Sequence, residues 1–114
     1  VTIQKEDSIF VTVPWPILDK RHMSDMGLDR DGILWAAATS DPGDDGPYES
    51  GIYKIGKFQK QNDKMEFLIA DSFPKQFVFQ RNKVEALTIS GNKTVFATDD
   101  ENLGAAINIS INGK

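Results

Sequence analysis

The sequence predicts an all-β fold made of antiparallel sheets, and three observations support this prediction. Short runs rich in Ile, Val, Phe, Tyr and Thr are separated by clusters of Gly, Pro, Asp and Asn, a pattern typical of strands joined by turns. Some runs alternate strictly, and Ile107, Ile109 and Ile111 recur with a period of two, whereas a helix would scatter them around its circumference. The third observation is an internal repeat of this strand pattern.

Eight segments are predicted to be strands because each holds at least two β-branched or aromatic residues. In chain order they are Ser8–Val13, Ile33–Ala38, Gly51–Phe58, Met65–Ala70, Gln76–Phe79, Val84–Ser90, Thr94–Thr98 and Ala105–Ile111. Between Trp15 and Gly27 the apolar pattern is poor. Pro16 at an early position and Gly27 at the end suit a helical turn or two, and an irregular crossing segment is the alternative.

Length and composition indicate one core. The 114 residues are 39% hydrophobic, so residues 1–114 are expected to form a single all-β domain or a fragment of one. The absence of cysteine excludes disulfides, thiolate chemistry and Cys-bound zinc. The chain begins with neither Met nor a signal peptide, which favours a processed product or a piece of a longer protein, and nothing indicates its localisation.

Charge and hydropathy limit the partners. The formal net charge is -4, and no Lys/Arg cluster with interleaved aromatic residues occurs, so no nucleic acid is expected to bind. No apolar run approaches the roughly 20 residues that cross a bilayer, so no membrane partner is expected either. A protein or a small molecule remains the expected kind of partner.

The repeat appears when the chain is shifted by 59 positions, the distance from Leu28 to Leu87. Both copies then read as a strand, a turn with Gly, an apolar strand ending in Ala-Thr, an acidic loop and an alternating strand. The blade-like repeats span about residues 25–72 and 84–111, and such repeats are typical of β-propeller blades. A β-sandwich is the alternative, because the length suits one domain. The aligned pairs are Leu28 and Leu87, Gly32 and Gly91, Ala38 and Ala97, Thr39 and Thr98, and Asp41 and Asp100.

Two stretches, GLDRDGILWAAATSD and KVEALTISGNKTVFATDDENLG, resemble the blade motifs of phytase-like or esterase-like β-propeller proteins. The resemblance covers roughly Met26 to Ile111 and implies the C-terminal two blades, approximately, of such a propeller. A closed propeller needs at least four blades. The resemblance therefore implies a fragment of a larger propeller, or a chain that self-associates to complete its ring.

The loop TSDPGDDGPYES is the first candidate site. Asp41, Asp44 and Asp45 alternate with Gly and Pro, an arrangement that lets carboxylates and carbonyls converge on a hard cation such as calcium. The same residue types are also the commonest loop formers, because of their turn chemistry. A calcium site and a solvated turn therefore both stay open for this loop.

The other candidate site is formed by acidic residues in the second copy of the repeat, Glu85, Asp99 and Asp100 together with Glu101. By alternation Glu85 shares a side of its strand with Leu87. A buried unpaired acid costs several kcal/mol, so Glu85 is expected to face solvent, a partner or a central channel.

No catalytic or cofactor-binding residue can be named. The single histidine, His22, is expected to be exposed, and the segment Asp29–Gly32 is expected to form a tight turn in which Asp31 bonds its own following backbone. Two functions follow, and they leave open whether the chain is an enzyme. The first is a non-enzymatic binding or scaffold module with calcium in its acidic loop. The alternative is a metal-dependent phosphatase or esterase-like hydrolase in which Asp41, Asp44, Asp45, Glu85, Asp99 and Asp100 hold the metal and Arg30 or Lys83 holds an anion.

Overall fold

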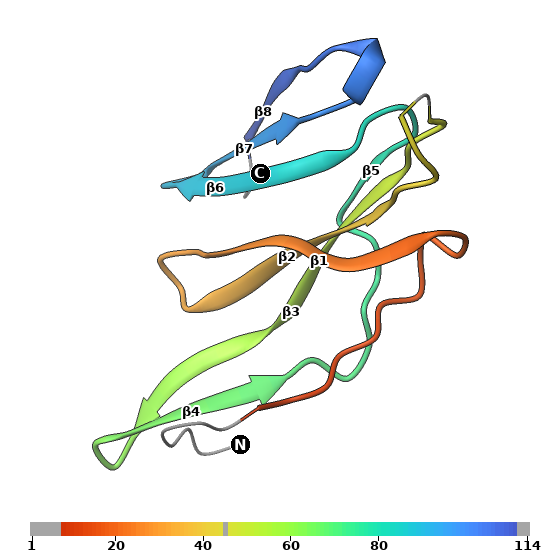
Figure 1. Ribbon diagram of the computed structural model, residues 1–114. Coiled ribbons are helices and arrows are strands. Elements are labelled where there is room, and N and C mark those ends of the chain that lie inside the picture. The colour runs from red at the N-terminus through yellow and green to blue at the C-terminus, as the bar shows by residue number, and fades with distance from the viewer. Residues whose placement is uncertain (1–7, 45, 112–114) are drawn as a thin grey trace.

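The computed structural model describes residues 8–44 and 46–111, which form two antiparallel β-sheets (Figure 1). The first sheet contains β1 (Lys20–Leu28), β2 (Ile33–Ser40), β3 (Ser50–Gln61), β4 (Lys64–Ile69) and β5 (Phe77–Phe79). The second contains β6 (Val84–Ser90), β7 (Lys93–Thr98) and β8 (Ile107–Ile111), with the short 3-10 helix η1 (Glu101–Leu103) before β8. Among the described residues, no helix is long and apolar enough to span a membrane.

The first sheet curls into a half-barrel because its longest strand changes partner along its length. The start of β3 pairs with β5, from Ser50 to Ile52, and its second half pairs with β4, from Gly56 to Gln61. At the point of change only a glycine fits, because a Cβ on Gly56 would lie 2.5 Å from both the Leu68 carbonyl oxygen and the Phe67 ring. The order of the sheet is β1-β2-β3-β4, with β5 beside the start of β3.

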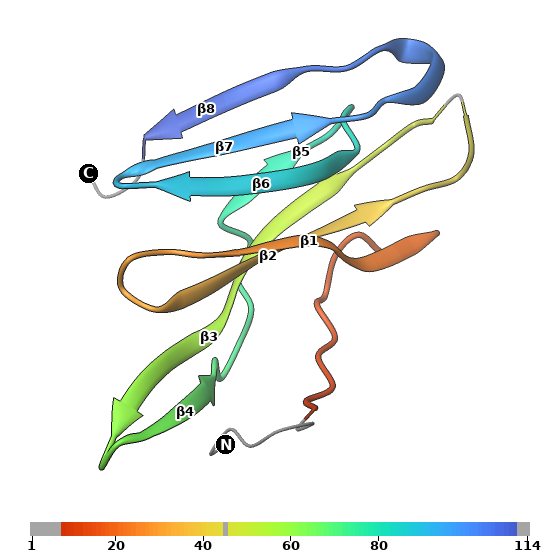
Figure 2. The ribbon, with the colours of Figure 1, turned by 60° about the vertical axis from the view of Figure 1, so that its left-hand side comes forward.

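Strand β2 is buried on both faces, which explains its uninterrupted run of apolar and small residues. On one face Ala36 and Ala38 belong to a cluster with Val13, Tyr53, Ile55 and Phe67. On the other face Trp35 and Ala37 pack with Ile52 and with Val84, Leu87 and Phe96 of the second sheet. The first sheet is therefore the middle layer of the molecule (Figure 2).

Aromatic side chains join the two sheets. The Phe96 ring of β7 is 1% exposed and makes edge contacts with two rings of β5, at centroid distances of 5.3 Å to Phe77 and 5.1 Å to Phe79. Such pairs add to the free energy gained from burial alone. The second sheet is thus packed face to face on the first rather than hydrogen-bonded to its edge.

The all-β antiparallel prediction is confirmed, and seven of the eight predicted strands correspond to β2 through β8. The prediction of a strand at Ser8–Val13 is wrong. The backbone of this segment belongs to neither sheet, and only Val11 and Val13 of its side chains pack on the cluster of the first sheet, with Val13 1% exposed.

The expectation of helical turns or an irregular crossing between Trp15 and Gly27 is wrong from Lys20 onward, where β1 begins, whereas residues 15–19 are irregular and include a turn. A bulge breaks the β1–β2 register between Arg21 and Asp25 and interrupts the alternation on which strand prediction depends. Most side chains of this strand are exposed or half-buried, so its composition lacks the apolar content of the other strands.

The two copies of the repeat form similar three-stranded meanders, β1-β2-β3 and β6-β7-β8. Gly32 and Gly91 take left-handed φ angles of 82° and 62° in the first turn of each meander. The aligned leucines are not equivalent, however. Leu28 pairs beside its turn with Leu34, whereas Leu87 pairs farther from its turn with Phe96.

Candidate functional site

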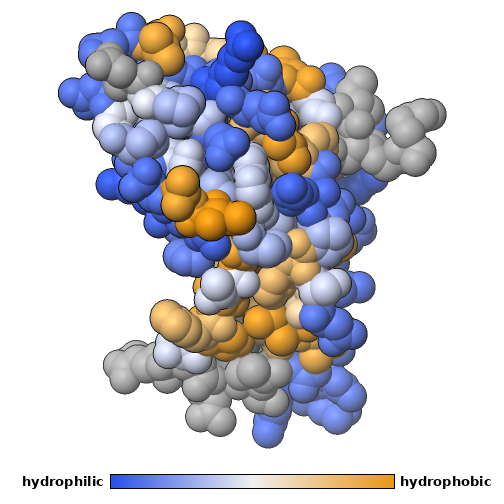
Figure 3. Space-filling model, turned by 90° about the vertical axis from the view of Figure 1, so that its right-hand side faces the viewer, coloured by the Kyte–Doolittle hydropathy of each residue, from blue (hydrophilic) through white to orange (hydrophobic). Residues whose placement is uncertain are grey.

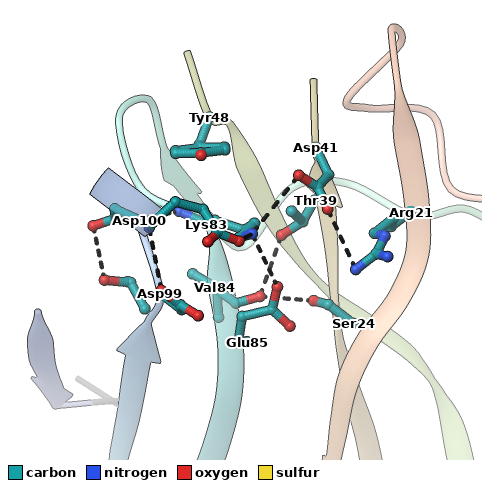
Figure 4. A network of polar contacts seen from close by, with 12 residues as sticks. Arg21, Ser24, Thr39, Asp41, Tyr48, Lys83, Val84, Glu85, Asp99 and Asp100 are labelled. Atoms are coloured by element: carbon teal, nitrogen blue, oxygen red, sulfur yellow. Dashed lines mark hydrogen bonds and ion pairs between the residues drawn. The ribbon is translucent and has the colours of Figure 1, made fainter. Parts of the chain in front are cut away.

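A buried lysine lies between three carboxylates where the two sheets meet (Figure 4). The Lys83 ammonium is 2.6 Å from an oxygen of Glu101, 3.7 Å from one of Asp41 and 3.8 Å from one of Glu85. It also lies 5.2 Å from the ring centroid of Tyr48, within cation–π distance. The side chain of Lys83 is 3% exposed, so nearly all of its hydration is replaced by these groups.

The strand ends bring these groups together. Asp41 follows the end of β2, Glu101 follows the end of β7, and Lys83 directly precedes β6. The two acidic loops touch, since the amide of Asn102 donates to the carbonyl oxygen of Asp44 at 3.4 Å. The hydrogen bond to Glu101, aided by the nearby carboxylates, raises the pKa of Lys83 above its usual range against the opposing effect of burial.

The cluster of Lys83, Asp41, Glu85 and Glu101 forms the acidic junction between the sheets, and Asp100 is bound beside it by uncharged donors. Its carboxylate is 5% exposed and accepts from the Lys83 amide at 2.7 Å, from Asn82 Nδ2 at 2.9 Å and from the Thr98 hydroxyl at 2.9 Å. Asp99 is exposed and accepts a hydrogen bond from the amide of Glu101 at 3.2 Å. Asp100 therefore fixes the entry of the chain into β6.

Hydroxyl groups extend the junction along the sheets. The hydroxyls of Thr39 and Ser50 lie 2.7 Å apart, and the amide of Val84 donates to Ser50 Oγ at 2.9 Å. Ser24 Oγ donates to the carbonyl oxygen of Val84 at 2.8 Å. In the described part of the chain, no buried side-chain nitrogen or oxygen lacks a hydrogen-bond partner. The interface between the sheets is therefore polar at this end and aromatic farther along.

The predicted metal ligands are only partly brought together. Asp41 and Glu85 face Lys83, Asp100 binds backbone and side-chain donors nearby, and Asp44 and Asp99 are exposed. Across residues 8–44 and 46–111, no group of three or more His, Cys, Asp or Glu side chains is arranged to hold a metal ion. Asp45 lies outside the described residues.

Sequence reasoning missed the role of Lys83 as the cation between these acids. Lysine is almost never fully buried, so a lysine before an apolar strand carries no signal of burial. Its proximity to two acidic loops becomes visible only once the sheets are stacked. The only indication of this site in the sequence was the pair of acidic loops at matching places in the repeat.

Glu85 does not share a face with Leu87, because a bulge between Val84 and Ala86 adds one residue to β6. With the bulge, Val84 and Leu87 both point into the core, with 0% and 6% exposed. Glu85 is left half-exposed beside Lys83.

The predicted turn at Asp29–Gly32 is present, but its amides are bound by the side chain of Asp29 and not by that of Asp31. Asp29 therefore caps the β1–β2 turn. One of its oxygens accepts from the amides of Asp31 at 2.8 Å and Ile33 at 2.9 Å, and the other accepts from Trp35 Nε1 at 3.0 Å. Burial acts to raise the pKa of Asp29, but these hydrogen bonds outweigh it and hold the pKa below its usual value.

A second candidate site lies on the opposite face of the first sheet. There the half-barrel and residues 9–12 line an open groove of about 640 Å³. Hydrophobic side chains gather across the lower half of the molecule in Figure 3. The bulge in β1 places three residues, from His22 to Ser24, opposite a single residue of β2. Bulges of this kind redirect side chains beside binding sites. The groove is lined by Ile9, Phe10, Val11, Thr12, His22, Met23, Met26, Leu34, Ile55, Phe58 and Phe67.

Polar groups are few in this groove. Thr12 and His22 are the polar members of its lining, and neither Asp, Glu, Lys nor Arg belongs to it. Several lining side chains are open to solvent, with 99% of Phe10 and 56% of Met26 exposed. His22 is exposed, as expected, and lies at this groove rather than in the acidic junction.

No protein-family model, curated protein or solved structure matches this chain. The two sites therefore have to be interpreted from their own geometry. The carboxylates of the acidic junction are engaged by Lys83, by Arg21 and by hydrogen-bond donors, whereas the groove presents open apolar surface. Of the two, the groove has the properties of a binding site.

Proposed function

We propose that this chain is a non-enzymatic binding module whose ligand is an uncharged apolar small molecule held in the groove. The observation that carries the proposal is the groove itself, with a volume of about 640 Å³ and a lining without formally charged side chains. Ligand pockets typically measure about 300 to 1,000 Å³ and are lined mainly by apolar groups.

The side chains at the rim suit an adaptable site. Met23 and Met26 come from β1, and methionine is flexible and polarisable enough to fit ligands of different shape. Phe58 and Phe67 form the floor with their rings 4.7 Å apart. Burial of an apolar ligand against these groups would supply the binding free energy, at roughly 25 cal/mol for each Å² removed from water.

Met26→Lys is expected to weaken binding of the neutral fluorescent probe N-phenyl-1-naphthylamine by at least about tenfold, because it places an ammonium where an apolar ligand would desolvate it. The matched control is Met65→Lys. Met65 is exposed to a similar extent, 46% against 56%, but lies on β4 outside the groove. The measurement is a fluorescence titration of the parent and both variants.

Saturable binding that Met26→Lys weakens and Met65→Lys leaves unchanged supports the proposal. Equal weakening by both variants, or no saturable binding by the parent chain, rejects it. Thermal unfolding of each variant shows whether the fold is kept.

We further propose that the two sheets are consecutive blade-type units, as in a β-propeller fragment. The sequential order β1-β2-β3-β4, the similar meander β6-β7-β8 and their face-to-face stacking support this proposal. Blades of a propeller are four-stranded antiparallel sheets packed around an axis. A binding or scaffold role suits such a unit, because its outer faces are available for contacts.

The hydrolytic alternative receives no specific support from the junction. A metal-dependent hydrolase needs carboxylates that are free to bind its cation. Asp41 and Glu85 instead face the ammonium of Lys83, and Asp100 accepts three hydrogen bonds.

Calcium binding by the loop 41–49 stays a prediction, and it requires that EDTA lower the melting temperature of the parent chain. A cation that binds only the native state at 100 times its Kd adds about 2.7 kcal/mol of stability. Thermal unfolding in calcium and then in EDTA measures this effect, and the variant in which Asp44 and Asp45 are changed to Asn should lose it. An unchanged melting temperature in EDTA contradicts the prediction.

A further inference from the structure

The outer edge of β8 is unpaired among the described strands. The second sheet runs β6-β7-β8, so β8 has a partner on one side, and it lies at the far end of the molecule from β4 (Figures 1 and 2). Its sequence, INISI, contains no charge and no proline, and its register with β7 is regular from Ile107 to Ile111. Natural proteins usually protect an open edge with a charge, a proline or a bulge. This edge has none of these devices.

The backbone of β8 presents hydrogen-bonding groups to this edge. The amide of Thr98 donates to the carbonyl oxygen of Ala106 at 3.0 Å, so Ala106 faces β7. Paired and unpaired positions alternate along an antiparallel ladder, so the amide and carbonyl groups of Ile107 and Ile109 point to the open side. Their side chains are exposed too, at 75% and 67%.

Self-pairing satisfies all of these groups at once. If two β8 strands meet antiparallel about Asn108, Ile107 of each copy stands opposite Ile109 of the other, and their outward amides and carbonyls bond to one another. On the same face, Val95 and Ala97 of β7 are the direct neighbours of Ile109 and Ile107. The joined sheets would therefore share one continuous apolar face.

Charge on β8 itself does not oppose pairing with a second copy of the chain. β8 is neutral, so pairing with itself opposes no like charges. The exposed Lys93 and Asp99, at the two ends of β7, would lie about three strand spacings, roughly 14 Å, from β7 of the second copy, so their charges are screened and do not affect the pairing.

We propose that two copies of this chain associate through their β8 edges into a twofold dimer with a continuous six-stranded sheet, β6-β7-β8 followed by the same strands of the second copy. This interface is separate from the apolar groove, which lies on the other side of the first sheet. It therefore does not depend on the proposed ligand.

The test is the mass of the chain in solution, measured by analytical ultracentrifugation over a wide range of concentration. The parent should shift from 12.7 kDa to twice that mass as concentration rises. Ile109→Pro removes an amide that points to the open edge and costs no hydrogen bond to β7, so it should remain monomeric. Ile109→Lys should do the same through charge repulsion between copies.

Leu103→Lys is the matched control, because Leu103 has a similar exposed fraction, 66%, but lies in η1 outside the edge. This variant should dimerise like the parent. Amide exchange should slow at Ile107 and Ile109 as concentration rises. The proposal is overturned if the parent chain stays monomeric or if Ile109→Pro still dimerises. It is also overturned if the dimer is disrupted by Met26→Lys, a change in the groove, and not by the changes at Ile109.

Discussion

Replacing Lys83 by Met is expected to lower the free energy of unfolding by about 3 kcal/mol, near the low end for removing one partner of a buried ion pair. Met fills a similar volume, so the loss is electrostatic. Asp41, Glu85 and Glu101 then lose the ammonium that lies 2.6 to 3.8 Å from them, and among the described residues only Asp41 keeps another cation, the exposed Arg21 at 3.4 Å. Because Glu85 and Glu101 are 34% and 36% exposed, water relieves part of the repulsion. Urea denaturation measures the loss.

The dependence of this effect on pH follows from the direction of the pKa shift. The pKa of Lys83 is raised on folding, chiefly by its hydrogen bond to Glu101. The stabilisation is therefore fully present below the ordinary lysine pKa and is lost only as pH rises through the raised value. The difference between parent and Lys83→Met should thus persist through neutral and mildly alkaline pH.

Two further variants identify the cause of the loss. Lys93→Met removes an exposed lysine and should change stability by no more than about 0.5 kcal/mol. Adding Glu101→Gln to Lys83→Met removes one of the repelling charges and should recover part of the lost stability. If Lys83→Met is as stable as Lys93→Met, the junction does not stabilise the fold.

The sequence predicted strands wherever apolar content was high, as it is in β2 and β3. The prediction failed at Ser8–Val13, where apolar side chains pack on a face of the sheet although the backbone pairs with no described strand. It also failed at β1, whose residues are mostly polar. Local patterns report side-chain burial, but they do not distinguish a segment lying across a sheet from a strand within it.

Bulges set a second limit on predicting from sequence which side chains are buried. The extra residue near Glu85 shifts the alternation of β6, so Val84 and Leu87 can both be buried although they are three positions apart. Nothing local in the sequence marks this shift, because it depends on the partner strand. The candidate site was likewise predicted as a set of acids, while the lysine that lies between them became evident only from the stacking of the sheets.

Phe96→Ala is expected to destabilise the chain by about 3 to 5 kcal/mol, the usual cost of truncating a buried phenylalanine. The Phe96 ring is 1% exposed and contacts Phe77 and Phe79 of the first sheet, so its loss opens a cavity between the two layers. Val95→Ala is the control in the same strand, since Val95 is half-buried on the opposite face and should cost far less.

This variant also tests whether the two sheets form one cooperative unit. The core on this side is shared, because Trp35 and Ile52 of the first sheet pack with Val84 and Phe96 of the second. Amide exchange in β2 and β7 should therefore accelerate together in Phe96→Ala, and urea unfolding followed by tryptophan fluorescence should show a single transition at lower urea. If exchange accelerates in β7 while β2 stays protected, the sheets unfold separately. The three-stranded sheet would then be a layer added to an independently stable half-barrel.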